Sequence, residues 1–134
     1  MAVMQVEFVS PEKRLASMEA EQVALPGGDG DFTAMPGHVP TATTLRPGVV
    51  RVVNGGSATE YLIAGGFAEI TGETISILAE FASTREDATK EMFEPQMNAL
   101  DEMIEKLDEG DTRHAEMKRH KHELTHLYDN LIPR

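Results

Sequence analysis

The hydrophobic period of this chain changes near residue 82, and this change limits the folds that it can adopt. Up to that point apolar residues alternate in short runs that are separated by glycine and proline. From Ser83 onward they recur every three or four positions, as on one face of a helix. The sequence therefore predicts an all-β domain over residues 1–82, followed by a helical segment over residues 83–134.

The first segment is typical of an antiparallel β-sandwich or barrel. Its short runs are rich in β-branched residues, and most of the 11 glycines and 7 prolines lie between them. One run, residues 49–53, ends at Asn54-Gly55-Gly56, which is a strong signal for a tight hairpin. The other runs are residues 4–9, 21–25, 61–64, 67–70 and 74–78. No long helical pattern separates the runs, which argues against βαβ units.

The second segment predicts two antiparallel helices. The first apolar stripe consists of Phe93, Met97, Leu100, Ile104 and Leu107. Pro95 either stands at the first position of a helix that Glu94 caps, or lies inside a longer helix that kinks there. Gly110 ends this helix, and Asp111 or Thr112 is expected to cap the second one. Both apolar stripes are narrow, so we expect the hairpin to lean on the β domain or on a partner.

Charge and composition exclude several classes of function. The net charge is −11, so we expect no binding of nucleic acid, and no stretch is apolar and long enough for direct membrane insertion. The absence of cysteine excludes disulfides, a thiol nucleophile and a cysteine-ligated zinc. Residues 1–82 and 83–110 each carry −6, whereas residues 111–134 carry +1 and four of the five histidines. This asymmetry marks either an interaction element or simply a solvated helix face.

Two motifs suggest chemistry, and their context argues against it. The glycine-rich run at residues 27–31 carries acidic side chains that would repel phosphate, so we interpret it as a turn. His122-Glu123-Leu124-Thr125-His126 matches the H-E-x-x-H signature of zinc hydrolases. The extended signature needs a glycine and a third histidine, where this chain has Asp129 and Ile132. A metallohydrolase is therefore the least favoured function, and we predict no catalytic residue, no metal and no cofactor.

Five short motifs follow one another in a specific order ahead of the helical segment. They are Leu25-Pro26-Gly27-Gly28-Asp29-Gly30-Asp31-Phe32, Pro36-Gly37-His38-Val39-Pro40, Leu45-Arg46-Pro47-Gly48-Val49-Val50, Gly65-Gly66-Phe67-Ala68-Glu69-Ile70 and Leu78-Ala79-Glu80. In order, spacing and position the chain resembles the epsilon subunit of the bacterial F-type ATP synthase, the rotary, proton-translocating enzyme. The resemblance implies a β-sandwich of about ten strands and a C-terminal hairpin of two helices, with no chemistry of its own.

The resemblance also implies a function. It describes a central-stalk rotor subunit that joins the gamma subunit to the c-subunit ring, at the cytoplasmic face of the bacterial inner membrane. By position it assigns the c-ring contact to Asp29, Gly30 and Asp31, and the gamma contact to His38. An unrelated β-sandwich adaptor with a helical tail is the alternative, because strand pattern and composition alone do not separate the two.

The helical segment departs from this family in two respects. Some members bind ATP through an Ile/Leu-Asp-x-x-Arg-Ala motif, and residues 88–93 lack the Asp, Arg and Ala at the required places. The family's hairpin is commonly alanine-rich, whereas this one is methionine-rich and contains Pro95. We therefore expect no ATP binding, and at most weak regulation of ATP hydrolysis through contact with the alpha/beta catalytic head. The residues expected to carry this regulation are Arg113, Lys118, Arg119, Lys121, His122 and His126.

Overall fold

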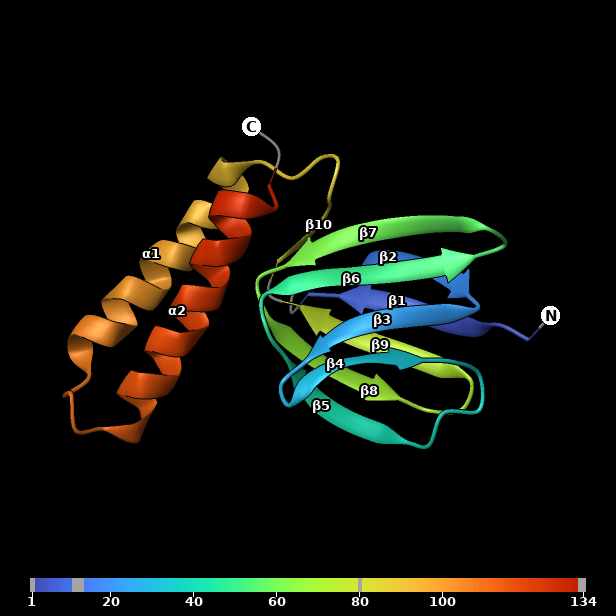
Figure 1. The fold of residues 1–134 in the computed structure, drawn as a ribbon, viewed down its shortest axis with the longest axis horizontal. Coiled ribbons are helices and arrows are strands. Elements are labelled where there is room, and N and C mark those ends of the chain that lie inside the picture. The colour runs from blue at the N-terminus through green and yellow to red at the C-terminus, as the bar shows by residue number, and fades with distance from the viewer. Residues whose placement is uncertain (1, 11–13, 80, 133–134) are drawn as a thin grey trace.

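Ten β-strands form two facing layers, and two helices pack against one end of these layers (Figure 1). The structure is a computed structural model that describes residues 2–10, 14–79 and 81–132. The strands are β1 (Met4–Val9), β2 (Arg14–Ala20), β3 (Gln22–Gly27), β4 (Gly30–Ala34), β5 (Thr41–Leu45), β6 (Gly48–Asn54), β7 (Ser57–Ile63), β8 (Gly66–Ile70), β9 (Thr74–Ala79) and β10 (Ala82–Thr84). The helices are α1 (Lys90–Lys106) and α2 (Thr112–Asn130). The predicted sandwich followed by a helical hairpin is confirmed.

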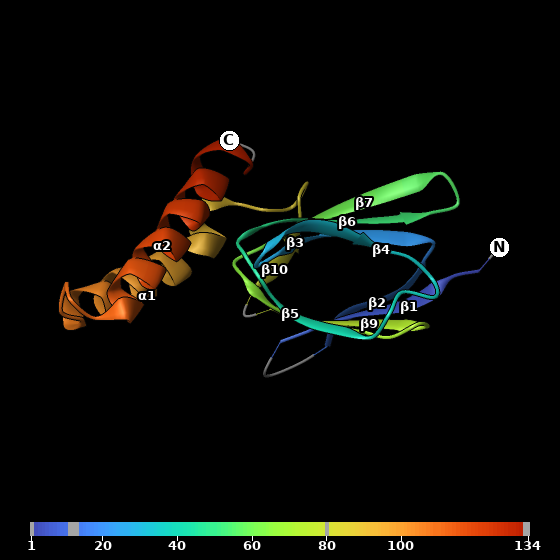
Figure 2. The same cartoon turned by 60° about the horizontal axis from the view of Figure 1, so that its bottom comes forward.

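The strands follow one continuous path that curls into the two layers. Their order is β10-β7-β6-β3-β5-β8-β9-β1-β2, and β4 pairs with β3 beside this path. Figure 2 shows β3, β4, β6 and β7 in one layer and β1, β2 and β9 in the other. Each pair of strands is antiparallel except β1 and β9, in which Gln5 lies opposite Thr74 in a parallel register. The N-terminal strand β1 is therefore hydrogen-bonded to a strand that comes much later in the chain.

Alternation along the strands fills the space between the layers. In β1 the side chains of Met4, Val6 and Phe8 are buried, and in the neighbouring β9 those of Ile75 and Ile77 are buried. Because successive side chains of a strand point to opposite faces, the residues between them face solvent. These five side chains belong to one cluster that also includes residues from β3, β6 and β8. This cluster is the core that gives the sandwich its rigidity.

Six strands lie where the alternating runs predicted them, and four do not show such a pattern. The tight turn at Asn54-Gly55-Gly56 joins β6 to β7, and both glycines have positive φ, as a two-residue hairpin turn requires. The strands without a clear signal are β2, β4, β5 and β10, which are short or rich in polar and small residues. Glu80 of the fifth motif lies outside the described residues.

The start of each helix can be compared with the alternatives that the sequence left open. α1 starts at Lys90 and continues through Pro95, so the longer helix is the correct alternative and Glu94 is not a cap. Asp111 is the N-cap of α2, because its carboxylate accepts a bond from the backbone N–H of Arg113 at 2.9 Å. β10 spans the predicted domain boundary between residues 82 and 83, so the sheet extends slightly further than the pattern indicated. Neither α1 nor α2 has the apolar length that a bilayer crossing requires.

Candidate functional site

The turn between β3 and β4 carries the residues predicted to contact the c ring. Gly27 pairs with Gly30 across this turn, and the exposed Asp29 lies between them. A Cβ on Gly27 would lie 2.6 Å from the carbonyl oxygen of Gly30, so only glycine fits there. Gly30 has φ +142°, which other residues rarely adopt. The backbone therefore presents Asp29 and Asp31 to solvent on a tightly defined turn.

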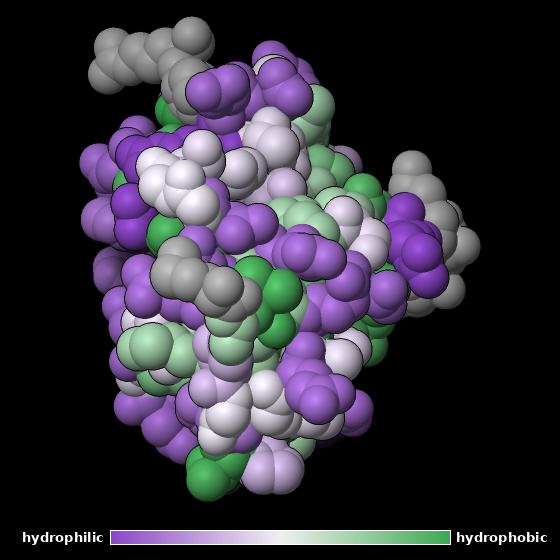
Figure 3. All heavy atoms as spheres, turned by 90° about the vertical axis from the view of Figure 1, so that its right-hand side faces the viewer, coloured by the Kyte–Doolittle hydropathy of each residue, from purple (hydrophilic) through white to green (hydrophobic). Residues whose placement is uncertain are grey.

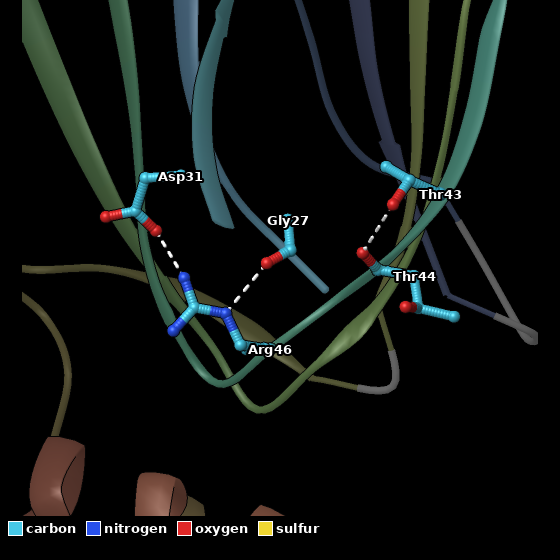
Figure 4. Close-up of polar contacts among 5 residues, drawn as sticks. All are labelled: Gly27, Asp31, Thr43, Thr44 and Arg46. Atoms are coloured by element: carbon cyan, nitrogen blue, oxygen red, sulfur yellow. Dashed lines mark hydrogen bonds and ion pairs between the residues drawn. The ribbon is translucent and has the colours of Figure 1, made fainter. Parts of the chain in front are cut away.

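Arg46 ties this turn to the beginning of the next hairpin (Figure 4). Its Nε donates to the carbonyl oxygen of Gly27 at 2.7 Å, and its Nη2 forms an ion pair with the carboxylate of Asp31. The backbone N–H of Arg46 also donates to the carbonyl oxygen of Pro26 at 2.8 Å. Asp31 is thus already neutralised by a neighbour, whereas no cation of the described residues pairs with Asp29. Asp29 is thus the carboxylate of this turn that is exposed and outside the ion pairs of the described residues.

His38 lies in the loop between β4 and β5, at the opposite end of the sandwich (Figure 1). The backbone N–H of Gly37 donates to the carbonyl oxygen of Gly72 at 2.9 Å, which holds this loop beside the turn between β8 and β9. Nδ1 of His38 lies 2.7 Å from the carbonyl oxygen of Val39, so Nδ1 carries the proton in this arrangement. Met35 and Val39 flank His38 and expose 52% and 71% of their surface.

The structure therefore places the two predicted contacts at opposite ends of one body. Figure 3 looks at the end that carries the loop of His38, where small hydrophobic patches are scattered among hydrophilic side chains. The turn of Asp29 lies at the other end, where β5 and β8 also meet the hairpin. The close-packed sandwich therefore separates the turn of Asp29 from the loop of His38.

The hairpin packs against the sandwich through a second, separate apolar cluster. Leu62 and Ala64 from the sandwich are buried against Phe93 of α1 and against Leu124 and Leu127 of α2. The rings of Phe81 and Phe93 meet edge to face with centroids 4.9 Å apart. Of the two supports expected for the narrow stripes of the hairpin, the β domain or a partner, the structure shows the β domain.

Polar contacts also link the two helices to each other. Lys121 of α2 forms an ion pair with Asp101 of α1, and the Lys90 ammonium lies 5.1 Å from the centre of the Tyr128 ring. The hydroxyl of Tyr128 donates to the carboxylate of Glu94 at 3.1 Å. Partial desolvation and this carboxylate raise the pKa of Tyr128. Of the residues predicted to regulate hydrolysis, Lys121 is thus engaged within the hairpin.

The remaining predicted regulatory residues lie along the exposed surface of α2. Lys118, Arg119, His122 and His126 are all exposed, and Arg113 is paired with Asp111 at 2.8 Å. The two histidines of the H-E-x-x-H match do not belong to any group of three or more potential metal ligands within the described residues. The structure thus supplies no third ligand for a metal site there.

A groove between the hairpin and the sandwich was not foreseen from the sequence. Its volume is about 550 Å³, and β5, β8, β9, α1 and α2 all contribute to its walls. The large side chains that line this groove include Leu78, Leu100, Met103, Met117 and His120. No sequence signal marks this groove, because it is formed by segments that the chain order separates.

Comparison with known proteins identifies relatives over the full length. The family described as "ATP synthase, Delta/Epsilon chain, beta-sandwich domain" matches residues 3–85. The ATP synthase epsilon chain of Jannaschia sp. (strain CCS1) is 45% identical over 134 residues, which is all of both chains. The ATP synthase epsilon chain of Paracoccus denitrificans (strain Pd 1222) is 45% identical over 85% of this chain and 78% of that protein.

Solved structures share the fold at low sequence identity. A chain of the mitochondrial ATP synthase of Euglena gracilis has a TM-score of 0.67 at 19% identity, with 98% of this chain and 80% of that chain covered. A chain from the mitochondrial ATP synthase of Tetrahymena thermophila has a TM-score of 0.63 at 15% identity, with 94% and 93% covered. Full-length similarity to curated proteins, the matched family and the shared fold agree, and this chain belongs to the epsilon chains of ATP synthase.

Proposed function

We propose that this chain is a non-catalytic rotor subunit that joins the gamma subunit to the c ring of a proton-translocating ATP synthase. The observation that carries the proposal is the 45% identity to an ATP synthase epsilon chain over all 134 residues. A joint that transmits torque needs a stiff body, and the close-packed core of the sandwich supplies one. Contact sites at opposite ends of that body suit a subunit with two neighbours.

The c-ring contact is proposed to lie at Asp29, Gly30 and Asp31. The resemblance gives the c ring basic polar loops, and an exposed carboxylate complements them. Arg46 holds Asp31 and the carbonyl oxygen of Gly27, so the turn is pre-organised before it meets the ring. Pre-organisation reduces the entropy lost on binding, so this turn is suited to a lasting contact.

The gamma contact is proposed to include His38 and the apolar side chains beside it. Met35 and Val39 are among the most exposed large apolar residues of the described chain. Burial of such side chains by a partner is favourable, and the bond of Nδ1 to Val39 holds the imidazole in a defined orientation. His38 would then add a directional polar contact to an otherwise apolar one.

The hairpin is proposed to regulate ATP hydrolysis only weakly. Its proposed partner is the alpha/beta catalytic head, which α2 would reach with Lys118, Arg119, His122 and His126. Against the sandwich the hairpin is held by one apolar cluster, and the ion pair of Lys121 and Asp101 joins the two helices to each other. Exposed ion pairs contribute only about 0.2–1 kcal/mol each, so contacts of the exposed cations of α2 with the catalytic head would add little.

The chain is proposed to act as a peripheral component at the cytoplasmic face of the bacterial inner membrane, without binding nucleic acid. The test is reconstitution of epsilon-depleted membranes with the purified chain. We expect restored coupling, measured as ATP-driven proton pumping, and co-purification with the gamma and c subunits. A chain that binds neither subunit and leaves pumping unrestored would refute the proposal.

A further inference from the structure

Two methionines line the groove between the hairpin and the sandwich. Met103 of α1 exposes 50% of its surface. Met117 of α2 is half-buried and packs against the apolar cluster that docks the hairpin. Met117 therefore contributes to docking and also borders a space that small solutes can enter.

The composition of the chain directs oxidation to methionine. There is no cysteine, so the thioether sulfur is the most readily oxidised group of the chain. Four of the eight methionines lie in the two helices, at positions 92, 97, 103 and 117. Of these, Met103 and Met117 are the two that line the groove.

Oxidation would change a surface on which docking depends. Leu78, Leu100 and Leu124 share the groove lining with the two methionines, so their surroundings are largely apolar. A sulfoxide is polar and chiral, so at the half-buried Met117 it would place a polar group among apolar side chains, which is unfavourable without a hydrogen-bond partner. Because the docking cluster is small, one such change should shift the balance between the docked and released hairpin.

We propose that Met103 and Met117 are oxidation sites through which peroxide loosens the hairpin from the sandwich. In the reaction the sulfur takes one oxygen atom from hydrogen peroxide, the O–O bond breaks, the S–O bond forms, and water leaves. The sulfur loses two electrons and the peroxide gains them. Methionine sulfoxide reductases reverse the change, so the state of the hairpin would report the local peroxide level. The proposal concerns the hairpin of this chain and does not depend on the rotor role.

A methionine elsewhere in the chain provides a matched control. Met35 exposes 52% of its surface, nearly the same as Met103, but it lies in the loop between β4 and β5. This loop is at the opposite end of the sandwich from the hairpin (Figure 1). Met35 should therefore be oxidised about as readily, with no effect on docking.

The experiment treats the purified full-length chain with hydrogen peroxide. Peptide mass spectrometry locates the sulfoxides, and hydrogen–deuterium exchange measures the opening of α2. We expect sulfoxide at Met35, Met103 and Met117, and exchange in α2 that is about 5 to 30 times faster, as a change of one or two kcal/mol would produce. The variant M103L/M117L retains apolar side chains of similar size and should not respond. The variant M35L should respond as the wild type does.

Each of the following results would overturn the proposal. The first is unchanged exchange in α2 although both groove methionines carry sulfoxide, and the second is absence of sulfoxide at both. The third is equal loosening in M103L/M117L. If exchange in α2 of the leucine variant is already fast before oxidation, the oxidised wild type is treated with methionine sulfoxide reductase instead. A return of α2 to slow exchange then supports the proposal. Exchange in α2 that stays fast after the treatment refutes it.

Discussion

The imidazole of His120 lies directly over the backbone of Gly65. A Cβ built on Gly65 would be 2.7 Å from Cε1 of His120 and 3.4 Å from its Nε2. Gly65 also has φ +108°, a conformation that side chains disfavour. Glycine is therefore required here both by the backbone of the turn between β7 and β8 and by the helix that packs on it.

The substitution Gly65→Ala should loosen the hairpin. Gly56→Ala is the matched control, because Gly56 has φ +83° but nothing within 4 Å of its Cβ position. We expect Gly65→Ala to lose about 1 kcal/mol more stability than the control in thermal unfolding, since the ring tip must also turn away. The double variant G65A/H120A should recover this difference. Equal losses in G65A and G56A would show that His120 does not contribute.

The N-cap of α2 should weaken in acid. Bonds from the side chain and backbone of Arg113 lower the pKa of Asp111 from 3.8 to about 2. A lowered folded-state pKa means that the stabilisation is complete above about pH 3.8 and is lost as the pH falls through about 2. Asp111→Ala should therefore speed amide exchange in the first turn of α2 at neutral pH and remove this acid dependence. Asp111→Asn, which can still cap the helix, separates the charge from the cap.

A chain that ends after residue 87 should still fold as a sandwich. The two apolar clusters share no residue, and β10 with the ion pair of Arg85 and Glu60 at 3.2 Å is retained. Because Leu62 becomes exposed, we expect a loss of about 1.5–3 kcal/mol, measured by thermal unfolding. A chain that ends after residue 81 lacks β10 and should be less stable still. An unfolded circular dichroism spectrum for residues 1–87 would contradict a self-sufficient sandwich.

Reversal of charge at Asp29 should weaken binding to the membrane sector. Asp29→Lys leaves the pair of Arg46 and Asp31 intact and places a cation against the basic loops expected on the c ring. Each close repulsion would cost on the order of 1 kcal/mol near a wet surface. The measurement is retention on epsilon-depleted membranes at low salt, with Glu19→Lys, at an exposed position of the edge strand β2, as control. Equal retention of the two variants would place the c-ring contact elsewhere.

Removal of residues 88–134 should raise ATP hydrolysis by the reconstituted enzyme only slightly. Only exposed cations of α2 are left to reach the catalytic head, and salt screens such contacts. We expect less than about a fivefold rise at low salt, which corresponds to about 1 kcal/mol, and a smaller rise at high salt. A rise of a hundredfold would instead identify the hairpin as a strong inhibitor.

The sequence predicted those features that depend on neighbours along the chain. The turn at Asn54-Gly55-Gly56 and the cap of α2 are local: the turn is confirmed, and of the two caps predicted, Asp111 and Thr112, the structure shows Asp111. Pro95 was ambiguous because its effect depends on whether packing of Phe93 and Leu100 holds the helix on either side of it. β2 had no recognisable pattern, since its pairing with β1 rather than its own alternation defines it.

The contacts of the candidate sites depend on residues that are distant in the sequence. Arg46 and Asp31 belong to different hairpins, so their pairing was not visible before the strands were assembled. The same holds for His120 and Gly65, and for the groove that they border. The glycine-rich run at residues 27–31 predicted the turn, but it gave no information on which carboxylate a neighbour already neutralises.

The parallel pairing of β1 with β9 affects the order in which a new chain can mature. While the ribosome is still extending the chain, β1 can pair with β2, but the edge of β1 that later pairs with β9 has no neighbouring strand. Synthesis at roughly 5–20 residues per second leaves this edge unpaired for several seconds. The nascent N-terminus is therefore a natural client for chaperones that shield extended apolar segments until the ninth strand emerges.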